Sequence, residues 1–393
     1  MKPFANRGMK LPINLIAETA KRGKVLQKKG LDIISLNQGQ PDFPTPEHIV
    51  YAAYNAARNG YTKYVPNHGI PELRKAVAEK LFNINKITYD PTDILITNGG
   101  ALGVYLTNMA LVESGTEVIA FEPYFGTYAT SVTLAQGKFV TVPMQIKNGQ
   151  FCISPDLLEQ AITPNTKLII LNSPSNPTGS ILTQEELEAV ADIVLRHDLW
   201  VLSDEVYESI IYNSNKHISI ASISKELVER TIIINSFSKS YSMTGWRLGY
   251  IASKNPQLIK IMSDIYHLSA RCATSFVQYA GLAALTGPQD ALYTMVAEYE
   301  RRRDFVVEKL SEIRGFNCTK PKGSFYVFVD VSDYNMDSIS FCNRLLEEAK
   351  VAVTPGKYFG KNCDKHLRLS FASSMQLLEE GIYRIKKTVE SWL

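Results

Sequence analysis

Residues 236–250 read Ser-Phe-Ser-Lys-Ser-Tyr-Ser-Met-Thr-Gly-Trp-Arg-Leu-Gly-Tyr and follow a β-branched run, residues 231–235, that predicts a buried strand. Lys239 therefore stands just past a strand end. A desolvated lysine, or one near other positive charge, has a lowered pKa and can form a Schiff base with an aldehyde. The flanking hydroxyls and Arg247 suit a phosphate. Aldehyde and phosphate together indicate pyridoxal phosphate.

Length and composition describe an ordinary globular protein. The chain has 393 residues, 45% hydrophobic and 21% charged, which is enough for two domains that share a large core. The net charge is only +3 and the basic residues are spread out, so no nucleic-acid or membrane partner is expected. No segment resembles a signal peptide or a membrane span, which predicts a cytoplasmic protein. Five scattered cysteines predict neither disulfides nor a metal site.

Alone, Lys239 also suits a solvated lysine in a serine-rich turn, but residues 236–250 closely resemble the cofactor-lysine signature of the class I and II aminotransferases. The resemblance continues over nearly the whole chain. It implies pyridoxal phosphate as cofactor and the type I fold of enzymes that use it. Such a fold is α/β, with a large domain built on a mostly parallel central sheet flanked by helices and a smaller α+β domain.

Strand-like and helical segments alternate from residue 93 to residue 171, as a parallel sheet with crossover helices requires. We expect residues 1–45 to form an N-terminal arm and part of the small domain. Residues 46–290 are then the large cofactor-binding domain. Residues 291–393 are the small C-terminal domain, including a bridging helix.

A phosphate site is expected where a predicted strand ending at Thr97 meets a glycine turn and a helix start. Free backbone N–H groups and the positive end of a helix dipole favour an anion there. The segment resembles the family's T-N-G-x-x-x-A motif, which implies that main-chain amides of Gly100 and Ala101 bind the phosphate. Ser236 and Ser238, together with Arg247, would complete the site.

The resemblance also assigns residues to the cofactor ring. Phe125 is expected to stack on its face, with Tyr124 as the alternative. In the D-E-x-Y motif, Asp204 pairs with the ring nitrogen and raises the pKa of that nitrogen, so the protonated ring can accept electrons. Tyr207 of the same motif and Asn176 of an N-P-x-N-P-T-G-like segment are expected at the phenolic oxygen.

Substrate contacts follow from two further motifs. Arg368 lies in R-L-S-x-A, whose arginine clamps the substrate α-carboxylate, as a planar guanidinium can. Gly39 lies in a G-x-P-D-F-x-T-P loop, whose glycine backbone lies against the same carboxylate; a purely structural turn is the alternative. Asn176 is expected to contact substrate as well as cofactor.

The resemblance implies a homodimer with shared active sites. The tyrosine of a Y-x-x-x-x-G-x-x-x-L-R motif, here Tyr64, would reach the partner's cofactor phosphate. Tyr61 is a competitor for that role. His267 and Arg271 are either contacts to the distal end of the substrate or the partner's phosphate, or interface ion-pair residues, and the sequence ranks neither first.

The expected activity is transfer of an amino group from an L-amino acid to a 2-oxo acid through the Lys239 Schiff base, with Lys239 also serving as general base. Related folds carry lyases, racemases and oxygen-using oxidases or hydroxylases, some acting on arginine, so these remain alternatives. An effector domain of a transcription regulator is disfavoured, because the resemblance begins within the first few dozen residues. The side-chain specificity stays open.

Overall fold

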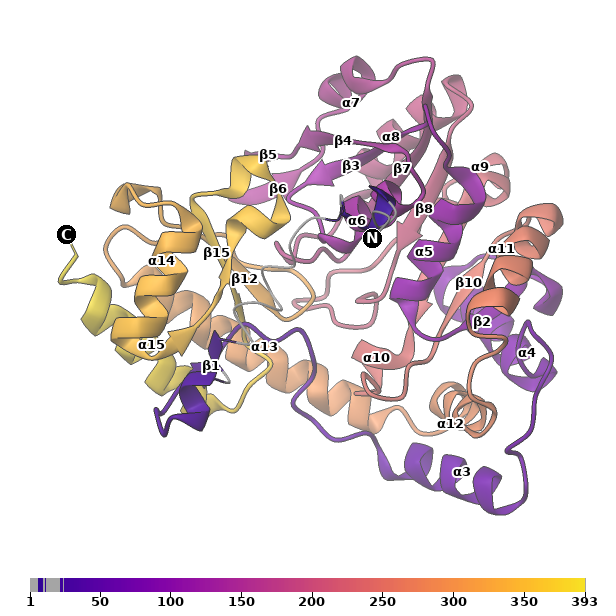
Figure 1. Cartoon of the computed structure of the whole chain (residues 1–393), viewed down its shortest axis with the longest axis horizontal. Helices are drawn as coiled ribbons and strands as arrows, with labels where there is room; N and C mark the ends of the chain where they lie inside the picture. The colour runs from indigo at the N-terminus through magenta and orange to yellow at the C-terminus, as the bar shows by residue number, and fades with distance from the viewer. Residues whose placement is uncertain (1–5, 10, 12–21, 24, 393) are drawn as a thin grey trace, which may run out of the picture.

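The computed structural model describes residues 6–9, 11, 22, 23 and 25–392, so the arm expected over residues 1–45 lies partly outside the described residues. Two β-sheets organise the chain (Figure 1). The larger sheet is formed by the middle of the sequence and is covered by helices. The smaller sheet is formed by the C-terminal part, and the long helix α13 (Asp290–Ser311) runs from beside one sheet to the other.

The larger sheet has seven strands in the order β2-β10-β9-β8-β7-β3-β4. All neighbours are parallel except β10, which runs antiparallel to both β9 and β2. The sheet is therefore mostly parallel, as expected. Its strands are β2 (Ile94–Thr97), β3 (Glu117–Glu122), β4 (Lys138–Pro143), β7 (Thr166–Asn172), β8 (Trp200–Asp204), β9 (Thr231–Ser236) and β10 (Gly249–Ala252).

The central strands are buried on both faces, which explains their near-continuous runs of Ile, Leu and Val. Helices pack on each face to provide that burial. One of them, α8, begins with a capping box in which Thr183 and Glu186 satisfy each other's backbone amides. The helices of this part are α3 (Glu47–Arg58), α4 (Pro71–Lys80), α5 (Gly100–Leu111), α6 (Thr127–Leu134), α7 (Pro155–Ala161), α8 (Gln184–Arg196), α9 (Lys225–Arg230), α10 (Phe237–Ser240), α11 (Pro256–Ser269) and α12 (Ser275–Thr286).

The smaller sheet is antiparallel, in the order β11-β12-β15-β14. A separate parallel pair joins β1 (Ile34–Ser35) to β13 (Val351–Ala352), so an N-terminal strand packs with the C-terminal part of the chain. The remaining elements of this C-terminal part are β11 (Asn317–Cys318), β12 (Tyr326–Asp330), β14 (Thr354–Pro355), β15 (His366–Ser370), α14 (Ser338–Arg344) and α15 (Met375–Val389). Elsewhere lie α1 (Asn6–Met9), the hairpin β5 (Gln145–Lys147) and β6 (Gln150–Cys152), and short 3₁₀ or π turns at Leu81–Asn85, Pro91–Asp93, Ile220–Ser222, Ser332–Tyr334, Leu345–Ala349, Gly356–Phe359 and Lys361–Cys363.

The strand directions bring distant residues to one edge of the larger sheet. Parallel strands β7, β8 and β9 end there with Asn172, Asp204 and Ser236, and Asn172 lies directly opposite Asp204. Because β10 runs the other way, it begins at this edge, where Gly249 pairs with both Ser236 and Thr97. Open α/β sheets bind ligands at such an edge.

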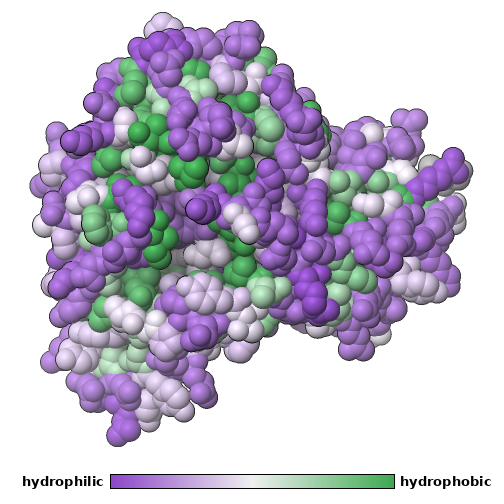
Figure 2. Space-filling model, turned by 180° about the vertical axis from the view of Figure 1, so that it is seen from behind, coloured by the Kyte–Doolittle hydropathy of each residue, from purple (hydrophilic) through white to green (hydrophobic). Residues whose placement is uncertain are grey.

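The face of the molecule that Figure 2 shows is mostly hydrophilic, with hydrophobic residues gathered in patches between the hydrophilic ones. Among the helices that the structure describes, none combines the length and the apolar character of a bilayer-crossing segment.

Candidate active site

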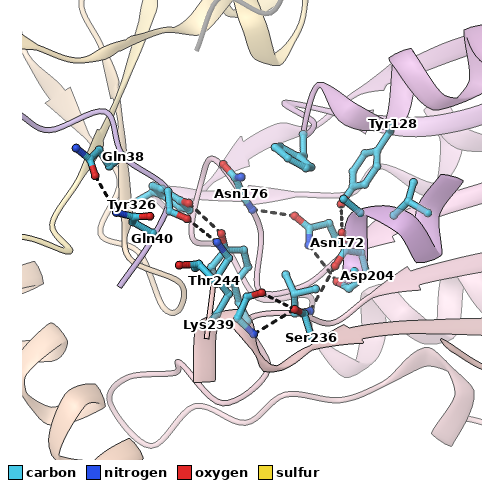
Figure 3. A pocket seen from close by; sticks show the side chains of 18 of the residues that line it. Gln38, Gln40, Tyr128, Asn172, Asn176, Asp204, Ser236, Lys239, Thr244 and Tyr326 are labelled. Atoms are coloured by element: carbon cyan, nitrogen blue, oxygen red, sulfur yellow. Dashed lines mark hydrogen bonds between the residues drawn. The ribbon is translucent and has the colours of Figure 1, made fainter. Parts of the chain in front are cut away.

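A cavity of about 450 Å³ opens at this edge of the larger sheet (Figure 3). Part of its wall comes from the larger sheet, and part comes from the smaller sheet and the loop after β1. Every site residue predicted from the sequence lines the cavity except Tyr64. Those that line it are Gly39, Gly100, Ala101, Phe125, Asn176, Asp204, Tyr207, Ser236, Ser238, Lys239, Arg247 and Arg368.

Lys239 lies in α10, immediately after β9, and its Nζ donates a hydrogen bond of 2.5 Å to the carbonyl of Gly39. Burial is the main cause of a lowered pKa, about 8, and the nearby positive charges of Arg368 and Arg247 lower it further. The amine therefore loses its proton more readily than an exposed lysine does. Such a lysine can act as a nucleophile and as a base.

Asp204 ends β8 and is buried, with 6% of its surface exposed. Its Oδ2 accepts a 2.6 Å hydrogen bond from the Tyr128 hydroxyl, while among the residues that the structure describes Oδ1 accepts only from the Val206 amide, at 3.4 Å. Desolvation raises the pKa of Asp204 to about 6, against the lowering effect of Tyr128. In the described part of the chain no cationic side chain pairs with this carboxylate. The carboxylate is suited to accept a hydrogen bond from a protonated ring nitrogen.

One corner of the cavity is built for an anion. Gly99 has φ +90°, which favours glycine, and a Cβ there would lie 2.7 Å from Nη2 of Arg247. Helix α5 begins at the next residue, so the amides of Gly100 and Ala101 lie in a first turn without intrahelical partners. Within the described part of the chain, Arg247 donates only to carbonyl oxygens, at Thr244 (2.9 Å) and Asn98 (3.3 Å).

Two serine hydroxyls face the same cavity. The Ser236 hydroxyl caps α10 by accepting from the Ser238 amide at 3.1 Å, and it lies 2.8 Å from the Ser238 hydroxyl. These hydroxyls, together with the α5 amides and the Arg247 guanidinium, form a donor set that matches a phosphate.

Arg368 lies on β15, in the part of the cavity wall that the smaller sheet forms, and is 1% exposed. It donates to the oxygens of Asn176 (2.9 Å), Asn37 (3.0 Å) and Thr354 (3.3 Å), all of them uncharged. Its Nε has no hydrogen-bond partner, and no carboxylate of the described residues pairs with it. A buried, uncompensated guanidinium demands an anion.

Aromatic rings close the cavity. Phe125 lies in its wall, whereas Tyr124, the alternative from the sequence, lines a separate small cavity beside it. Tyr207 shares a 2.9 Å hydrogen bond with Tyr326, whose ring lies 4.3 Å from the Arg368 guanidinium. Burial raises the pKa of Tyr207 well above its usual value, so the phenol stays protonated and able to donate.

Tyr64 lies outside this cavity with 78% of its surface exposed, and the Arg271 guanidinium stacks 4.6 Å from its ring. Tyr61 instead packs on Tyr279, with ring centroids 4.6 Å apart. His267 and Arg271 are both exposed. None of these four residues named from the sequence contacts the cavity within one chain.

Sequence reasoning missed several lining residues, namely Asn37, Tyr128, Asn172 and Tyr326. Asn172 links two of the predicted residues, because it donates to the Asp204 carbonyl at 3.0 Å and accepts from the Asn176 amide at 2.8 Å. The place of Asn172 at the end of a strand was the one available signal. Tyr128 and Tyr326 reach the site only through tertiary packing.

The residues present fit pyridoxal phosphate. An anion corner, a flat aromatic wall, an uncompensated carboxylate and a neutralisable lysine correspond to its phosphate, ring, ring nitrogen and aldehyde. Among the described residues the Nε of Arg368 has no acceptor, so it remains available to a substrate carboxylate.

Comparison with known proteins gives the same result. Residues 31–385 match the family described as aminotransferase class I and II. The chain is 43% identical to an aspartate aminotransferase of Bacillus subtilis, over 96% of both chains. The solved aspartate aminotransferase of Thermus thermophilus with maleate superimposes with a TM-score of 0.92 at 36% identity, covering 98% of this chain and all of that one. An aromatic aminotransferase of Pyrococcus horikoshii gives 0.89 at 41% identity, covering 94% and 99%.

Proposed function

Because the chain belongs to the class I and II aminotransferases, pyridoxal-phosphate-dependent enzymes of the type I fold that exchange amino groups between amino and 2-oxo acids, we propose L-aspartate as its amino donor. We also propose that the cavity around Lys239 is the active site. The observation that carries the site assignment is the buried Arg368 guanidinium, which faces the same cavity as Lys239 and has no acidic partner among the described residues.

When bound, pyridoxal phosphate withdraws electrons from the substrate Cα and makes its proton acidic. Arg368 holds the α-carboxylate and thereby orients the Cα–H bond. Lys239, with its pKa near 8, accepts the Cα proton as a neutral amine. It then returns that proton at the carbon that was the cofactor's aldehyde carbon. Asp204 holds a proton at the ring nitrogen.

The remaining cavity residues bind and orient. Gly100 and Ala101 offer backbone amides to the phosphate, and Ser236, Ser238 and Arg247 surround it. Phe125 stacks on the ring. Tyr207 and Asn176 donate to the phenolic oxygen; the Asn176 amide oxygen already accepts from Arg368, which leaves its Nδ2 for that bond. The Gly39 carbonyl is an acceptor for the Lys239 amine when that amine is free to move a proton.

The choice of aspartate is supported by the relatives named above, two of which are aspartate aminotransferases, one of them solved with the dicarboxylate maleate. Arg368 and Arg247 are the two arginines in the cavity wall, and both have roles here. The second carboxylate of aspartate therefore needs another donor. Gln38 and Gln40, which line the cavity and are exposed, are neutral candidates, and the exposed Arg271, supplied by a second copy, would be a cationic one.

A half-reaction screen tests the substrate. The holoenzyme is mixed with one amino acid at a time, and conversion of the cofactor to its amine form is followed by absorbance. Aspartate is expected to react with at least tenfold higher apparent second-order rate constant than phenylalanine or tyrosine. A preference for the aromatic amino acids would overturn the aspartate proposal and leave aminotransfer intact. Catalytic oxygen consumption would instead indicate an oxidase.

We further propose that two copies form a dimer with shared active sites. The support is the resemblance of the Tyr64 segment to the family's motif, together with the exposure of Tyr64 (78%) and Leu268 (88%), two large side chains that a partner subunit would cover. Sedimentation of the holoenzyme is expected to give twice the 44.0 kDa chain mass. The cytoplasmic location and the division at residues 45/46 and 290/291 stay predictions from the sequence.

A further inference from the structure

Tyr128 is a buried phenol to which neither the sequence nor the proposed function gives a role. It lies on α6 and is 1% exposed. Its hydroxyl donates to Oδ2 of Asp204 at 2.6 Å, as Figure 3 shows. Its ring meets the Phe125 ring edge to face, with centroids 5.8 Å apart and an interplanar angle of 87°. One side chain therefore touches both the carboxylate and the aromatic wall.

The bond leaves the two oxygens of Asp204 unequal. Oδ2 accepts a short bond from Tyr128, whereas Oδ1, as far as the described residues go, has only the distant Val206 amide, 3.4 Å away. A short bond from a neutral donor to a carboxylate is strong, because the acceptor is charged. Oδ1 is thus the oxygen that remains available to a second donor, and rotation of the carboxyl group would break the bond to Tyr128.

We infer that Tyr128 is a positioning residue that orients Asp204 with Oδ1 toward the cofactor ring nitrogen and supports the Phe125 ring at stacking height. This inference rests on the proposed role of Asp204. Tyr128 touches no reacting atom. It acts by removing the rotational freedom of Asp204 and by stabilising the negative charge of a carboxylate that burial disfavours.

The two contacts of Tyr128 can be separated. Tyr128→Phe keeps the ring beside Phe125 and removes only the hydroxyl. Tyr124→Phe is the matched control, since it also removes a nearby phenolic hydroxyl, one with no hydrogen bond to Asp204 and on a residue of the adjacent cavity.

The probes are pyridoxamine phosphate, which forms no bond to Lys239, and its analogue with carbon in place of the ring nitrogen. Their dissociation constants from the apoenzyme are measured by equilibrium fluorescence. The ratio of the two constants reports the contact at the ring nitrogen alone. The wild type and Tyr124→Phe are expected to share one ratio, favouring pyridoxamine phosphate. In Tyr128→Phe that ratio falls by about tenfold, the usual worth of one bond to a charged group, while affinity for the analogue changes less than about twofold.

The outcomes are distinguishable. If Tyr128→Phe loses affinity for both probes equally, the role of Tyr128 is merely structural and the inference is overturned. If the wild type itself binds both probes equally, the proposed role of Asp204 fails.

Two further measurements keep the test decisive. In an Asp204→Asn background, Tyr128→Phe is expected to change the ratio no further. Should Tyr128→Phe fail to fold, the downfield proton resonance of the Tyr128–Asp204 bond in the wild-type apoenzyme is the readout. It is expected to shift on addition of pyridoxamine phosphate and to remain in place with the analogue; equal shifts would overturn the inference.

Discussion

Replacing Arg368 by lysine tests the carboxylate site most directly, because lysine keeps the charge and loses the planar fork. A guanidinium has five N–H donors. Three bonds of Arg368 go to Asn176, Asn37 and Thr354, which leaves two donors, one of them on Nε, for a ligand carboxylate.

The expected effect follows from those two donors. Each bond to a charged group contributes about 1.5–3 kcal/mol, so losing both costs about 3–6 kcal/mol. A lysine recovers part of this through its charge, which sets the expected loss of kcat/KM for the amino donor at about 100-fold. The loss is expected mainly in KM if the carboxylate contact is equally strong in the ground state and the transition state.

The assay is steady-state kinetics with the donor found in the half-reaction screen, run beside the affinity of the apoenzyme for pyridoxamine phosphate. That affinity is expected to stay within about threefold, because Arg368 reaches the proposed cofactor contacts only through its bond to the Asn176 amide oxygen, which a lysine ammonium can still donate to. A decrease of kcat/KM by less than about threefold would refute the carboxylate role of Arg368. A parallel loss of pyridoxamine phosphate affinity would show that the substitution had disturbed the fold of the cavity instead.

Three other substitutions test the remaining parts of the site. Borohydride reduction is expected to attach the cofactor covalently to the wild type and not to Lys239→Ala, as mass spectrometry of the intact chain would show; attachment in the variant would place the reactive amine elsewhere. The folded apoenzyme holds the Asp204 pKa at about 6, above the ordinary 3.8, so this carboxylate destabilises the fold above pH 6 and has no such effect below pH 3.8. Asp204→Asn apoenzyme is therefore expected to be more stable than wild type at pH 8, by about 1–3 kcal/mol, and to lose that advantage toward pH 4 in denaturant titrations; an advantage independent of pH would contradict the burial argument. Tyr64→Phe is expected to weaken pyridoxamine phosphate binding about tenfold with the dimer intact in sedimentation, whereas unchanged binding would remove Tyr64 from the phosphate site.

Residues at the ends of strands were predictable from the sequence. Asp204 and Lys239 follow buried β-branched runs, and parallel strands end at a common edge, so their convergence needed no structure. Only the cavity of the structure distinguishes Phe125 from Tyr124 as the residue that lines the site. Both residues follow β3, and the direction of the chain after a strand end depends on packing.

Other contacts depend on long-range packing and had no local signal. Tyr128 meets Asp204 from 76 positions away, and Gly39 meets Lys239 across 200. The reversed direction of β10, which brings Arg247 beside the start of α5, is likewise invisible in a four-residue apolar strand. The family resemblance supplied Gly39 and Arg247, whereas Tyr128 appeared in no quoted motif.

The pairing of β1 with β13 has a consequence for how such a protein can diverge. It ties the Gly39 loop to the same body that carries Arg368, while Lys239, Asp204 and the anion corner belong to the other. The residues proposed for the reaction chemistry and those proposed to bind the substrate carboxylate thus lie mainly in different parts of the molecule. Variants from libraries that randomise the loop after β1 and the strands around Arg368 are expected to change their amino-donor preference and still to bind pyridoxal phosphate.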